Sequence, residues 1–221
     1  PAPIQAHYLG YGTTIGSDKV DWLISDSIHS SPELIKYCNE SIMLLPNSFM
    51  SAEYVKNDCI ESSRKNEMLP EDNTVFANFN TPSKFDPKSF KCWMEIIHNV
   101  PGSVLWLKNC SELTKKNIFK EAKNLDINSE RLIFAERKPR LEHIQRLKLA
   151  DICIDNFLHN GGVTTIDALI AGVPVITLKG LNHSERTSSS ILSAADLQNC
   201  IAENEVDYIK ICTSLALNKN K

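Results

Sequence analysis

The sequence predicts an α/β fold built on a Rossmann-like, doubly wound parallel sheet. From residue 72 onward, short apolar runs alternate with segments of helical periodicity. The apolar runs are continuous, as expected for parallel strands that helices cover on both faces. Expected strands lie at 75–79, 103–107, 131–134, 151–154 and 175–178, and expected helices at 87–100, 111–124, 141–149, 164–171 and 185–195.

The residues before this alternation predict a smaller unit. Residues 1–9 contain two prolines and the β-prone Ile4 and Tyr8, which favours an extended segment. Periodicity then fades between about 46 and 73, with 61–67 as the most polar part, and this stretch is the candidate linker between units. Within the smaller unit we expect a glycine-punctuated loop at 10–16, a strand at 20–25, a helix at 31–37 and a strand at 41–45. The chain therefore divides into residues 1–62, a linker at 63–71 and a domain at 72–221.

Composition excludes several classes of protein. The 221 residues are 42% hydrophobic, enough for a buried core, and the net charge of −3 does not favour general binding to nucleic acid. No apolar run approaches the length of a membrane span, so we expect no membrane association. The seven cysteines form no C-x-x-C pair, so neither a zinc site nor a disulfide framework is predicted, and a reducing, cytoplasmic setting is expected. Because the chain begins with Pro1, we expect it to be a piece of a longer protein.

A glycine-rich turn, Asn160-Gly161-Gly162, is the centre of the predicted site. Two glycines before a helix N-terminus let backbone N–H groups approach an anion, and the helix dipole favours a phosphate there. Asp167 lies one turn inside the helix on the same side as Thr164, within reach of a ribose hydroxyl. The turn therefore predicts a grip for the diphosphate and ribose of a nucleotide sugar. The alternative is a plain turn in which Thr164 and Asp167 form a capping box.

Basic side chains follow two of the other predicted strands. Lys84 lies in the loop before the helix that begins at Pro87, where its ammonium group would reach a phosphate and contribute about 1.5–3 kcal/mol. Arg140, His143 and Arg146 recur at every third position of the next such helix, and cations at a helix start oppose the helix dipole. These positions predict contacts with an anionic ligand. A solvated loop lysine and a solvated helix face are the alternatives.

The segment 184–190 is rich in hydroxyl side chains, which we expect to cap the helix that follows, with no role assigned to Arg186. Contact of these hydroxyls with a ligand is the alternative. Positions in the core or in strands are expected for the apolar and aromatic residues Trp22, Cys92, Trp93, Trp106 and Cys153.

Several short motifs occur along the chain in a fixed order. They are Pro1-Ala-Pro-Ile-Gln5, Leu9-Gly10-Tyr11, Asn78-Phe-Asn80 with Lys84 and Asp86-Pro87, Val100-Pro-Gly-Ser-Val-Leu-Trp-Leu107, Glu142-His143, Leu149-Ala-Asp151, Asn160-Gly161, Asp167-Ala-Leu169 and Ala171-Gly-Val-Pro174. Together they resemble the catalytic region of the O-linked N-acetylglucosamine transferase family, including its bacterial and SPINDLY-like members. The resemblance runs from Pro1 to about Asp207, and its specificity comes from the combined order of the motifs.

The resemblance implies a GT-B glycosyltransferase, in which two Rossmann-like domains meet and the C-terminal one holds most of the nucleotide sugar. Residues 1–62 would be the tail of the N-terminal catalytic domain, and residues 72–221 the C-terminal domain. The tetratricopeptide repeats and the first part of the N-terminal domain would lie outside this chain. In the family those parts bind protein substrates and supply an active-site histidine. The long insertion that animal members carry between the two domains is also absent.

Carried over residue by residue, the resemblance implies roles for the predicted site. Lys84 would contact the diphosphate and serve catalysis, with Thr81 in the same loop. Uracil and ribose would lie against Lys138, Pro139 and Arg140, and the base would pack beside His143 with Arg146 close by. The phosphate turn would be formed by Gly162, Val163 and Thr164, and Asp167 would hold the ribose. The sugar and the acceptor would be faced by Gly10, Tyr11, Gly12 and Thr13.

The sequence departs from the family pattern in three segments. The family usually has His-Thr-Thr at the phosphate turn, where this chain has Gly162-Val163-Thr164. Thr81 stands where many members have Gln, and Gly12 where the family commonly has Pro. The expected activity is inverting, metal-independent transfer of N-acetylglucosamine from UDP-GlcNAc to Ser or Thr hydroxyls of proteins, with no general base assigned. Transfer of fucose from GDP-fucose and a non-catalytic nucleotide-binding or scaffold module are the alternatives.

Overall fold

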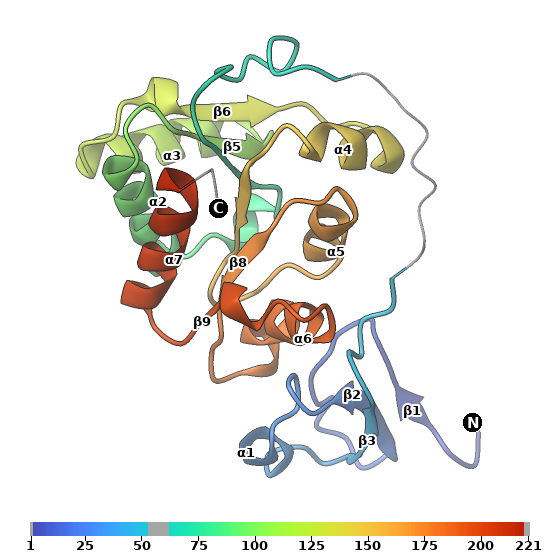
Figure 1. The fold of residues 1–221 in the computed structure, drawn as a ribbon. Coiled ribbons are helices and arrows are strands. Elements are labelled where there is room, and N and C mark those ends of the chain that lie inside the picture. Colours follow the sequence, from blue (N-terminus) through green and yellow to red (C-terminus); the bar gives the residue numbers. More distant parts are fainter. Residues whose placement is uncertain (1, 53–61, 219–221) are drawn as a thin grey trace.

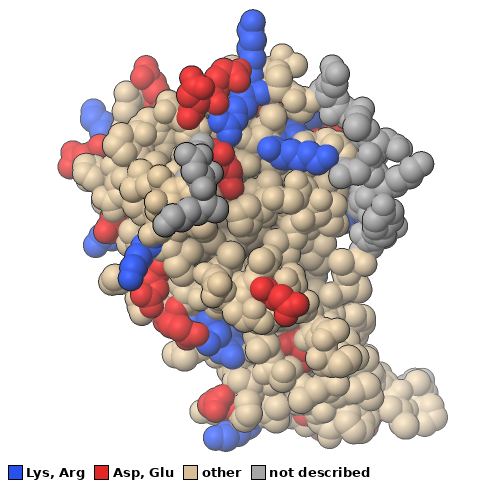
Figure 2. Space-filling model, viewed as in Figure 1, with Lys and Arg blue, Asp and Glu red and all other residues tan. Residues whose placement is uncertain are grey.

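The computed structural model describes residues 2–52 and 62–218. In these ranges the chain forms a small three-stranded sheet and a larger unit around a six-stranded sheet, with helix α6 nearest the small sheet (Figure 1). No helix in the described ranges is both long and apolar enough to cross a membrane. In Figure 2, basic and acidic side chains are interspersed on the face shown.

The larger sheet confirms the predicted doubly wound topology. All its strand pairs are parallel, and their order is β6-β5-β4-β7-β8-β9. The order therefore reverses between the neighbours β4 and β7, which makes a topological switch point. The strands are β4 (Val75–Asn78), β5 (Val104–Lys108), β6 (Leu132–Ala135), β7 (Ile152–Ile154), β8 (Val175–Leu178) and β9 (Ile201–Ala202).

Helices cover both faces of this sheet and enclose a separate core on each. One core contains Phe76, Trp93 and Tyr208, and the other contains Trp106 and Leu192. Figure 1 shows α2 (Pro87–Asn99), α3 (Glu112–Asn124) and α7 (Glu205–Leu217) on one face and α4 (Arg140–Leu147), α5 (Val163–Ile170) and α6 (Thr187–Ala194) on the other. Short 3₁₀ turns lie at η1 (Pro82–Lys84), η2 (Ser129–Arg131), η3 (His183–Glu185) and η4 (Gln198–Cys200). Cys92 and Cys153 are buried, as predicted.

Local sequence signals set the helix that follows the switch point. The Asp86 side chain accepts hydrogen bonds from the backbone N–H groups of Lys88 and Ser89, and Pro87 occupies the first helical position of α2. Such a proline fits there because the first N–H groups of a helix have no partner within the helix. The loop that holds Lys84 is therefore fixed at its downstream end.

The small sheet is parallel, in the order β1-β2-β3. It consists of β1 (Ala6–His7), β2 (Trp22–Asp26) and β3 (Ser41–Leu45), with the short helix α1 (Pro32–Ile35) between the last two strands. Leu23 is its fully buried apolar residue, whereas Met43 and Leu44 on β3 are exposed.

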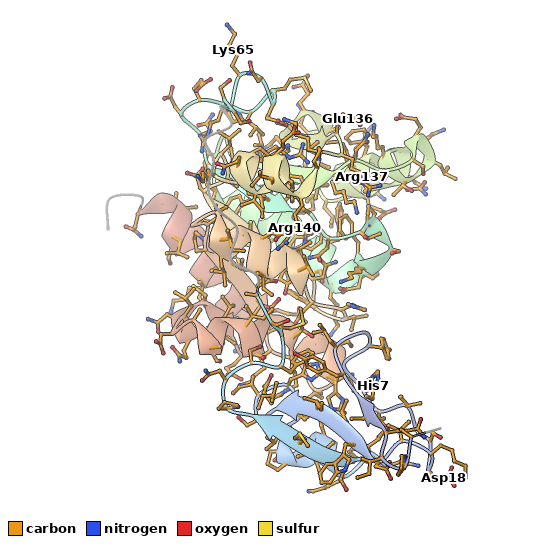
Figure 3. The ribbon with its side chains drawn as sticks, turned by 90° about the vertical axis from the view of Figure 1, so that its right-hand side faces the viewer. His7, Asp18, Lys65, Glu136, Arg137 and Arg140 are labelled. Carbon is orange, nitrogen blue, oxygen red and sulfur yellow. The ribbon has the colours of Figure 1, made fainter. Side chains whose placement is uncertain are left out.

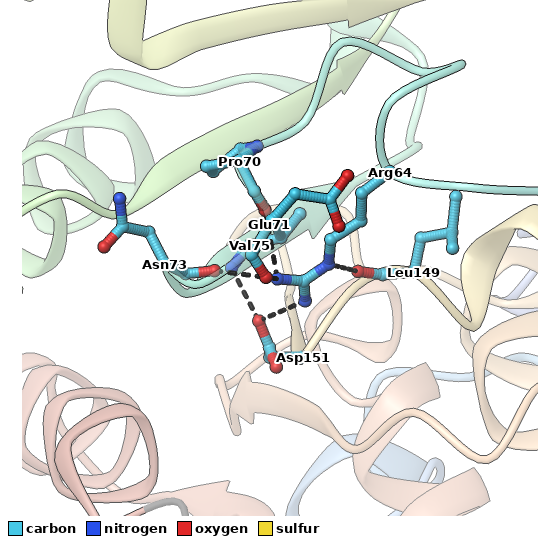
Figure 4. Close-up of polar contacts among 7 residues, drawn as sticks. All are labelled: Arg64, Pro70, Glu71, Asn73, Val75, Leu149 and Asp151. Carbon is cyan, nitrogen blue, oxygen red and sulfur yellow. Dashed lines mark hydrogen bonds and ion pairs between the residues drawn. The ribbon is translucent and has the colours of Figure 1, made fainter.

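The segment that joins the two sheets packs against the larger unit. Arg64 forms an ion pair with Asp151 at 2.9 Å. Its guanidinium group also donates hydrogen bonds to the carbonyl groups of Pro70, Glu71, Asn73 and Leu149 (Figure 4). Polar composition predicts a linker here, and in the structure one of its polar side chains, Arg64, is bonded to the larger unit. The division at residues 62 and 72 stays a prediction, since residues 53–61 lie outside the described residues.

Hydroxyl groups at the start of α6 connect the two units, and the predicted capping role is wrong. No side chain caps α6. Instead Ser190 donates to Asp26 at 2.6 Å and lies 2.7 Å from the hydroxyl of Ser48, while Arg186 donates to the carbonyl of Ile28 at 2.7 Å. The small sheet is thus bonded to the N-terminal end of α6, next to the glycine turn.

Candidate functional site

Amide and carboxylate side chains bridge the ends of β4 and β7 at the switch point. Asn78 donates to the side-chain oxygen of Asn156 at 2.8 Å, and Asn80 donates to Asp155 at 3.2 Å. All four residues are buried. The loops that leave the two strands are therefore held in fixed positions where ligands of doubly wound sheets bind. Asp155 and Asn156 are not among the predicted site residues, although an Asp-Asn pair directly after an apolar strand is a usable signal.

Asp155 holds the glycine turn in place through a hydrogen bond to its backbone. Its carboxylate accepts hydrogen bonds from the backbone N–H of Gly161 at 2.8 Å and from the hydroxyl of Thr177 at 2.9 Å. Burial raises the pKa of Asp155, and these hydrogen bonds act in the opposite direction. A Cβ on Gly161 would lie 2.5 Å from Thr165 Oγ1 and 2.6 Å from Thr164 Oγ1, so only glycine fits there.

Helix α5 begins at this turn without a side-chain cap. Thr164 donates its hydroxyl to Asn80 at 2.9 Å, so the capping-box alternative for Thr164 and Asp167 is wrong. Gly162 is the N-cap residue, and Val163 is 56% exposed. The first N–H groups of α5 therefore remain for a ligand, in the position predicted for the phosphate turn.

Two cavities adjoin at this helix end. The first, of about 330 Å³, is lined by the loop at 9–13, by Thr81, Lys84 and Asn160, and by His29. The second, of about 400 Å³, is lined by the residues at 135–138 and the α4 side chains, together with Asp167. Figure 3 shows Glu136, Arg137 and Arg140 together on one side of the larger unit. Both cavities are lined by Phe79, Lys108, Val163 and Thr164.

Lys84 brings its ammonium group into the first cavity from η1. Its Nζ donates to the carbonyl of Asn160 at 3.0 Å, across the switch point. Burial lowers the pKa of Lys84, Asp155 raises it and Lys108 lowers it. Within the described ranges Asn160 is the acceptor that Lys84 meets, so the ammonium group retains N–H groups for an anion beside α5. Thr81, in the same loop, lies at the edge of this cavity.

The basic side chains of α4 take different positions from one another. Arg140 donates from Nε and Nη2 to Asp167 and is 41% exposed, whereas Arg146 is 3% exposed. Arg146 lies over the rings of Phe79 and Trp106, 5.2 and 5.7 Å from their centroids. Arg146 is therefore buried at the floor of the second cavity. The alternative of a solvated helix face does not apply to Arg146.

Glu67, from the joining segment, contacts two of the side chains that line the second cavity. Its carboxylate lies 3.7 Å from Arg146 Nη1 and accepts from Lys138. Lys138 thus enters the cavity wall already paired with a carboxylate. Pro139 is the N-cap residue of α4 and lies outside the lining of both cavities.

His143 is a neutral ring at the base of the second cavity. Burial and the neighbouring Arg146 lower the pKa of His143 to about 4. Arg146 Nε donates to His143 Nδ1 at 3.2 Å, so the ring proton lies on Nε2. The ring packs edge-on against Phe79 with centroids 4.6 Å apart. A flat, uncharged ring of this kind suits a nucleobase.

The loop at 10–13 packs on a histidine that the sequence analysis did not single out. A Cβ on Gly12 would lie 2.9 Å from Cε1 of His29, so the loop approaches this ring closely. Thr13 lies 3.3 Å from Nδ1 of His183, which in turn contacts Ser30. Burial, with His183 nearby, lowers the pKa of His29 to about 4. Nothing in the local sequence signals this, because the buried environment of His29 comes from distant segments.

Residues 50–221 match the profile of glycosyl transferase family 41. The chain belongs to this family. It is 33% identical over 228 residues to the probable UDP-N-acetylglucosamine–peptide N-acetylglucosaminyltransferase SEC of Arabidopsis thaliana, covering all of this chain and 23% of that protein. It is 29% identical over 223 residues to the corresponding SPINDLY protein of Solanum lycopersicum, covering 98% of this chain and 23% of that protein. The family 41 chain thus spans less than a quarter of these curated relatives.

A solved structure confirms the fold class. An O-GlcNAc transferase mutant of Thermobaculum terrenum superposes with a TM-score of 0.87 at 24% identity, covering 97% of this chain and 41% of that one. The family 41 chain therefore has the α/β, GT-B-type arrangement that the sequence predicted. Its larger unit carries the Rossmann-like sheet.

Proposed function

We propose that this family 41 chain forms the nucleotide-sugar site of an inverting protein glycosyltransferase that transfers N-acetylglucosamine from UDP-GlcNAc to Ser or Thr hydroxyls. The observation that carries the proposal is the pair of adjoining cavities at the switch point, with Lys84 and the start of α5 beside their junction. The names of the Arabidopsis and tomato relatives, both UDP-N-acetylglucosamine–peptide transferases, support it.

The donor would occupy the two cavities in a defined direction. The nucleoside would lie over His143 and Arg140 in the second cavity, with its ribose toward Asp167. The sugar would lie in the first cavity under the loop at 10–13, open to the acceptor. The diphosphate would then pass the uncapped N-terminus of α5, where backbone N–H groups favour an anion.

The chemistry follows from charge stabilisation. As the acceptor oxygen bonds to the anomeric carbon from the opposite side, the bond to the diphosphate breaks and negative charge grows on its oxygens. Lys84 and the α5 N–H groups lie where that charge develops, and such prearranged donors stabilise a leaving group most. This mechanism uses no metal ion. Catalysis by the complete enzyme would also need the remainder of the N-terminal catalytic domain and its protein-binding repeats, and we place it in the cytoplasm.

One observation favours a second donor. Gly162 leaves the phosphate turn without an imidazole, and a Cβ there would lie 3.2 Å from Cε of Met50. The turn therefore differs from the usual family pattern in the place where the diphosphate binds, and GDP-fucose is the competing donor. The third possibility is a scaffold module that transfers no sugar.

Calorimetric titration of the chain with UDP, UDP-GlcNAc and GDP-fucose tests these assignments. We expect UDP and UDP-GlcNAc to bind and GDP-fucose to bind at least tenfold more weakly. Preference for GDP-fucose would support fucosyl transfer. No heat with any of the three nucleotides would support the scaffold role. Repeating the titration with EDTA tests the metal-free assignment, which requires unchanged affinity.

A further inference from the structure

Lys108 occupies the junction between the two cavities. It is the last residue of β5, and it lines both cavities, whereas Lys84 lines the first alone. Thr164, at the start of α5, also lines both cavities. A ligand that extends from one cavity into the other would therefore pass by Lys108 and the N-terminus of α5.

The charge of Lys108 is not neutralised by the protein around it. Three of the other basic groups of the second cavity face carboxylates: Arg140 contacts Asp167, and Lys138 and Arg146 contact Glu67. Arg137, also in the lining of this cavity, forms no ion pair within the described ranges. The contact of Lys108 is with the neutral hydroxyl of Thr81, at 3.5 Å, the long limit of a hydrogen bond. No carboxylate in the described ranges forms an ion pair with Lys108.

The field of this unpaired ammonium group reaches both cavities. After burial, Lys108 is among the groups that lower the pKa of Lys84 in the first cavity and of His143 in the second. Two ammonium groups that repel each other are stabilised when an anion lies between them. The junction thus combines two cations and a helix N-terminus around one position.

We propose that Lys108 is a second phosphate-binding residue, which contacts the phosphate bonded to the nucleoside while Lys84 contacts the phosphate bonded to the sugar. The assignment follows from position, since Lys108 borders the nucleoside cavity and Lys84 does not. It rests on the proposed function, because it requires a nucleoside diphosphate in the two cavities. It adds a residue on β5 that the motif comparison did not include.

Titration of Lys108→Ala and Lys84→Ala with uridine, UMP and UDP tests the assignment. We expect Lys108→Ala to weaken UMP and UDP each by about tenfold and to leave uridine unchanged. Lys84→Ala should weaken UDP by a similar factor and UMP by less than threefold. Lys108→Arg keeps the charge and should stay within threefold of the unaltered chain. Lys120→Ala, an exposed lysine of α3 outside both cavities, is the matched control.

The outcomes separate this inference from the proposed function. If the unaltered chain binds UDP and Lys108→Ala binds UMP and UDP equally well, Lys108 does not contact phosphate. If Lys108→Ala weakens uridine as much as UDP, its effect comes from the cavity wall, and the inference is also wrong. Absence of UDP binding by the unaltered chain would overturn the uridine-nucleotide function itself and this inference with it. Thermal melting of each variant shows that the fold is retained.

Discussion

Arg140 on α4 donates two hydrogen bonds to one carboxylate oxygen of Asp167 on α5, from Nε at 3.1 Å and from Nη2 at 2.8 Å. The two partners differ in environment, because Asp167 is 7% exposed and Arg140 is 41% exposed. The pair joins two helices along the wall of the nucleoside cavity. A ribose hydroxyl bound to Asp167 would therefore meet a carboxylate that is already oriented.

This difference in burial predicts unequal costs for the two truncations. Arg140→Ala leaves a buried carboxylate without this partner and should lower the free energy of unfolding by roughly 2–3 kcal/mol. Asp167→Ala leaves an arginine that water can solvate and should lower the melting temperature by only a few degrees while weakening UDP binding. Melting curves and UDP titrations of both variants check this. An equal loss of stability in both would contradict the proposed asymmetry.

Lys84→Ala should weaken UDP binding at least tenfold, which corresponds to about 1.4 kcal/mol, because an anion next to α5 loses its direct cationic partner. The fold should be unaffected, since Lys84 contributes one hydrogen bond to the Asn160 carbonyl. Calorimetry of the variant is the measurement. Unchanged affinity for UDP would remove Lys84 from the site.

Gly161→Ala should lower both stability and nucleotide affinity. The new Cβ would overlap the hydroxyl oxygens of Thr164 and Thr165, and relieving such overlap costs roughly 1–3 kcal/mol. Gly10→Ala is the matched control, because nothing lies within 4 Å of a Cβ at that position. Melting temperature and UDP affinity are measured for both variants. A Gly161→Ala protein that matches Gly10→Ala in both would show that the turn has room.

Arg64→Ala should destabilise the larger unit by roughly 2–3 kcal/mol, since several carbonyl groups and Asp151 lose a common donor. The expected fall in melting temperature is about 5–10 °C for a protein of this size. Lys65→Ala, an exposed neighbour that points away from the fold in Figure 3, serves as control. If Arg64→Ala and Lys65→Ala have the same melting temperature, the Arg64 contacts do not contribute to stability.

Stability should decline as the pH falls from about 6.5 toward 4. His29 and His143, each with a pKa lowered to about 4, stay neutral in the folded chain over this interval, whereas the unfolded chain takes up protons there. The unfolded state is therefore favoured by up to about 1.4 kcal/mol per pH unit for each ring. Melting temperature measured against pH checks this.

A variant separates the contribution of one ring. His29→Gln should flatten the pH dependence between 6.5 and 4, because it removes a group that binds a proton only on unfolding. His98→Gln, at an exposed position of α2, is the control for replacing an imidazole by an amide. Equal slopes for the two variants would show that His29 does not contribute.

The strands and helices of the larger unit could be predicted from sequence because their apolar runs are long and regular. Strand β9 could not, since Ile201 and Ala202 are too short a run to signal a strand. Helix α7 was also missed: Val206 is 73% exposed while Tyr208 is fully buried, so its apolar residues do not lie on one face. Its position depends on packing against α2 and β8.

The site also contains residues that local sequence predicts and residues that it does not. Gly161, Thr164 and Lys84 carry local signals, a glycine turn before a helix and a lysine at a strand end. The state of Arg146 and the burial of His29 depend on partners far along the chain, Glu67 and His183 among them. Local sequence shows that a charged or titratable group is present, but only the fold determines whether another side chain neutralises or buries it.

Glu67 belongs to the stretch of chain that joins the two sheets, and it also supplies the negative charge behind Lys138 and Arg146. Three residues earlier, Arg64 ties the same stretch to Asp151, which precedes β7. The joining segment therefore supplies the carboxylate that pairs with two side chains of the nucleoside cavity. Replacing Glu67 would thus change the charge beneath the base without removing any residue of the cavity lining.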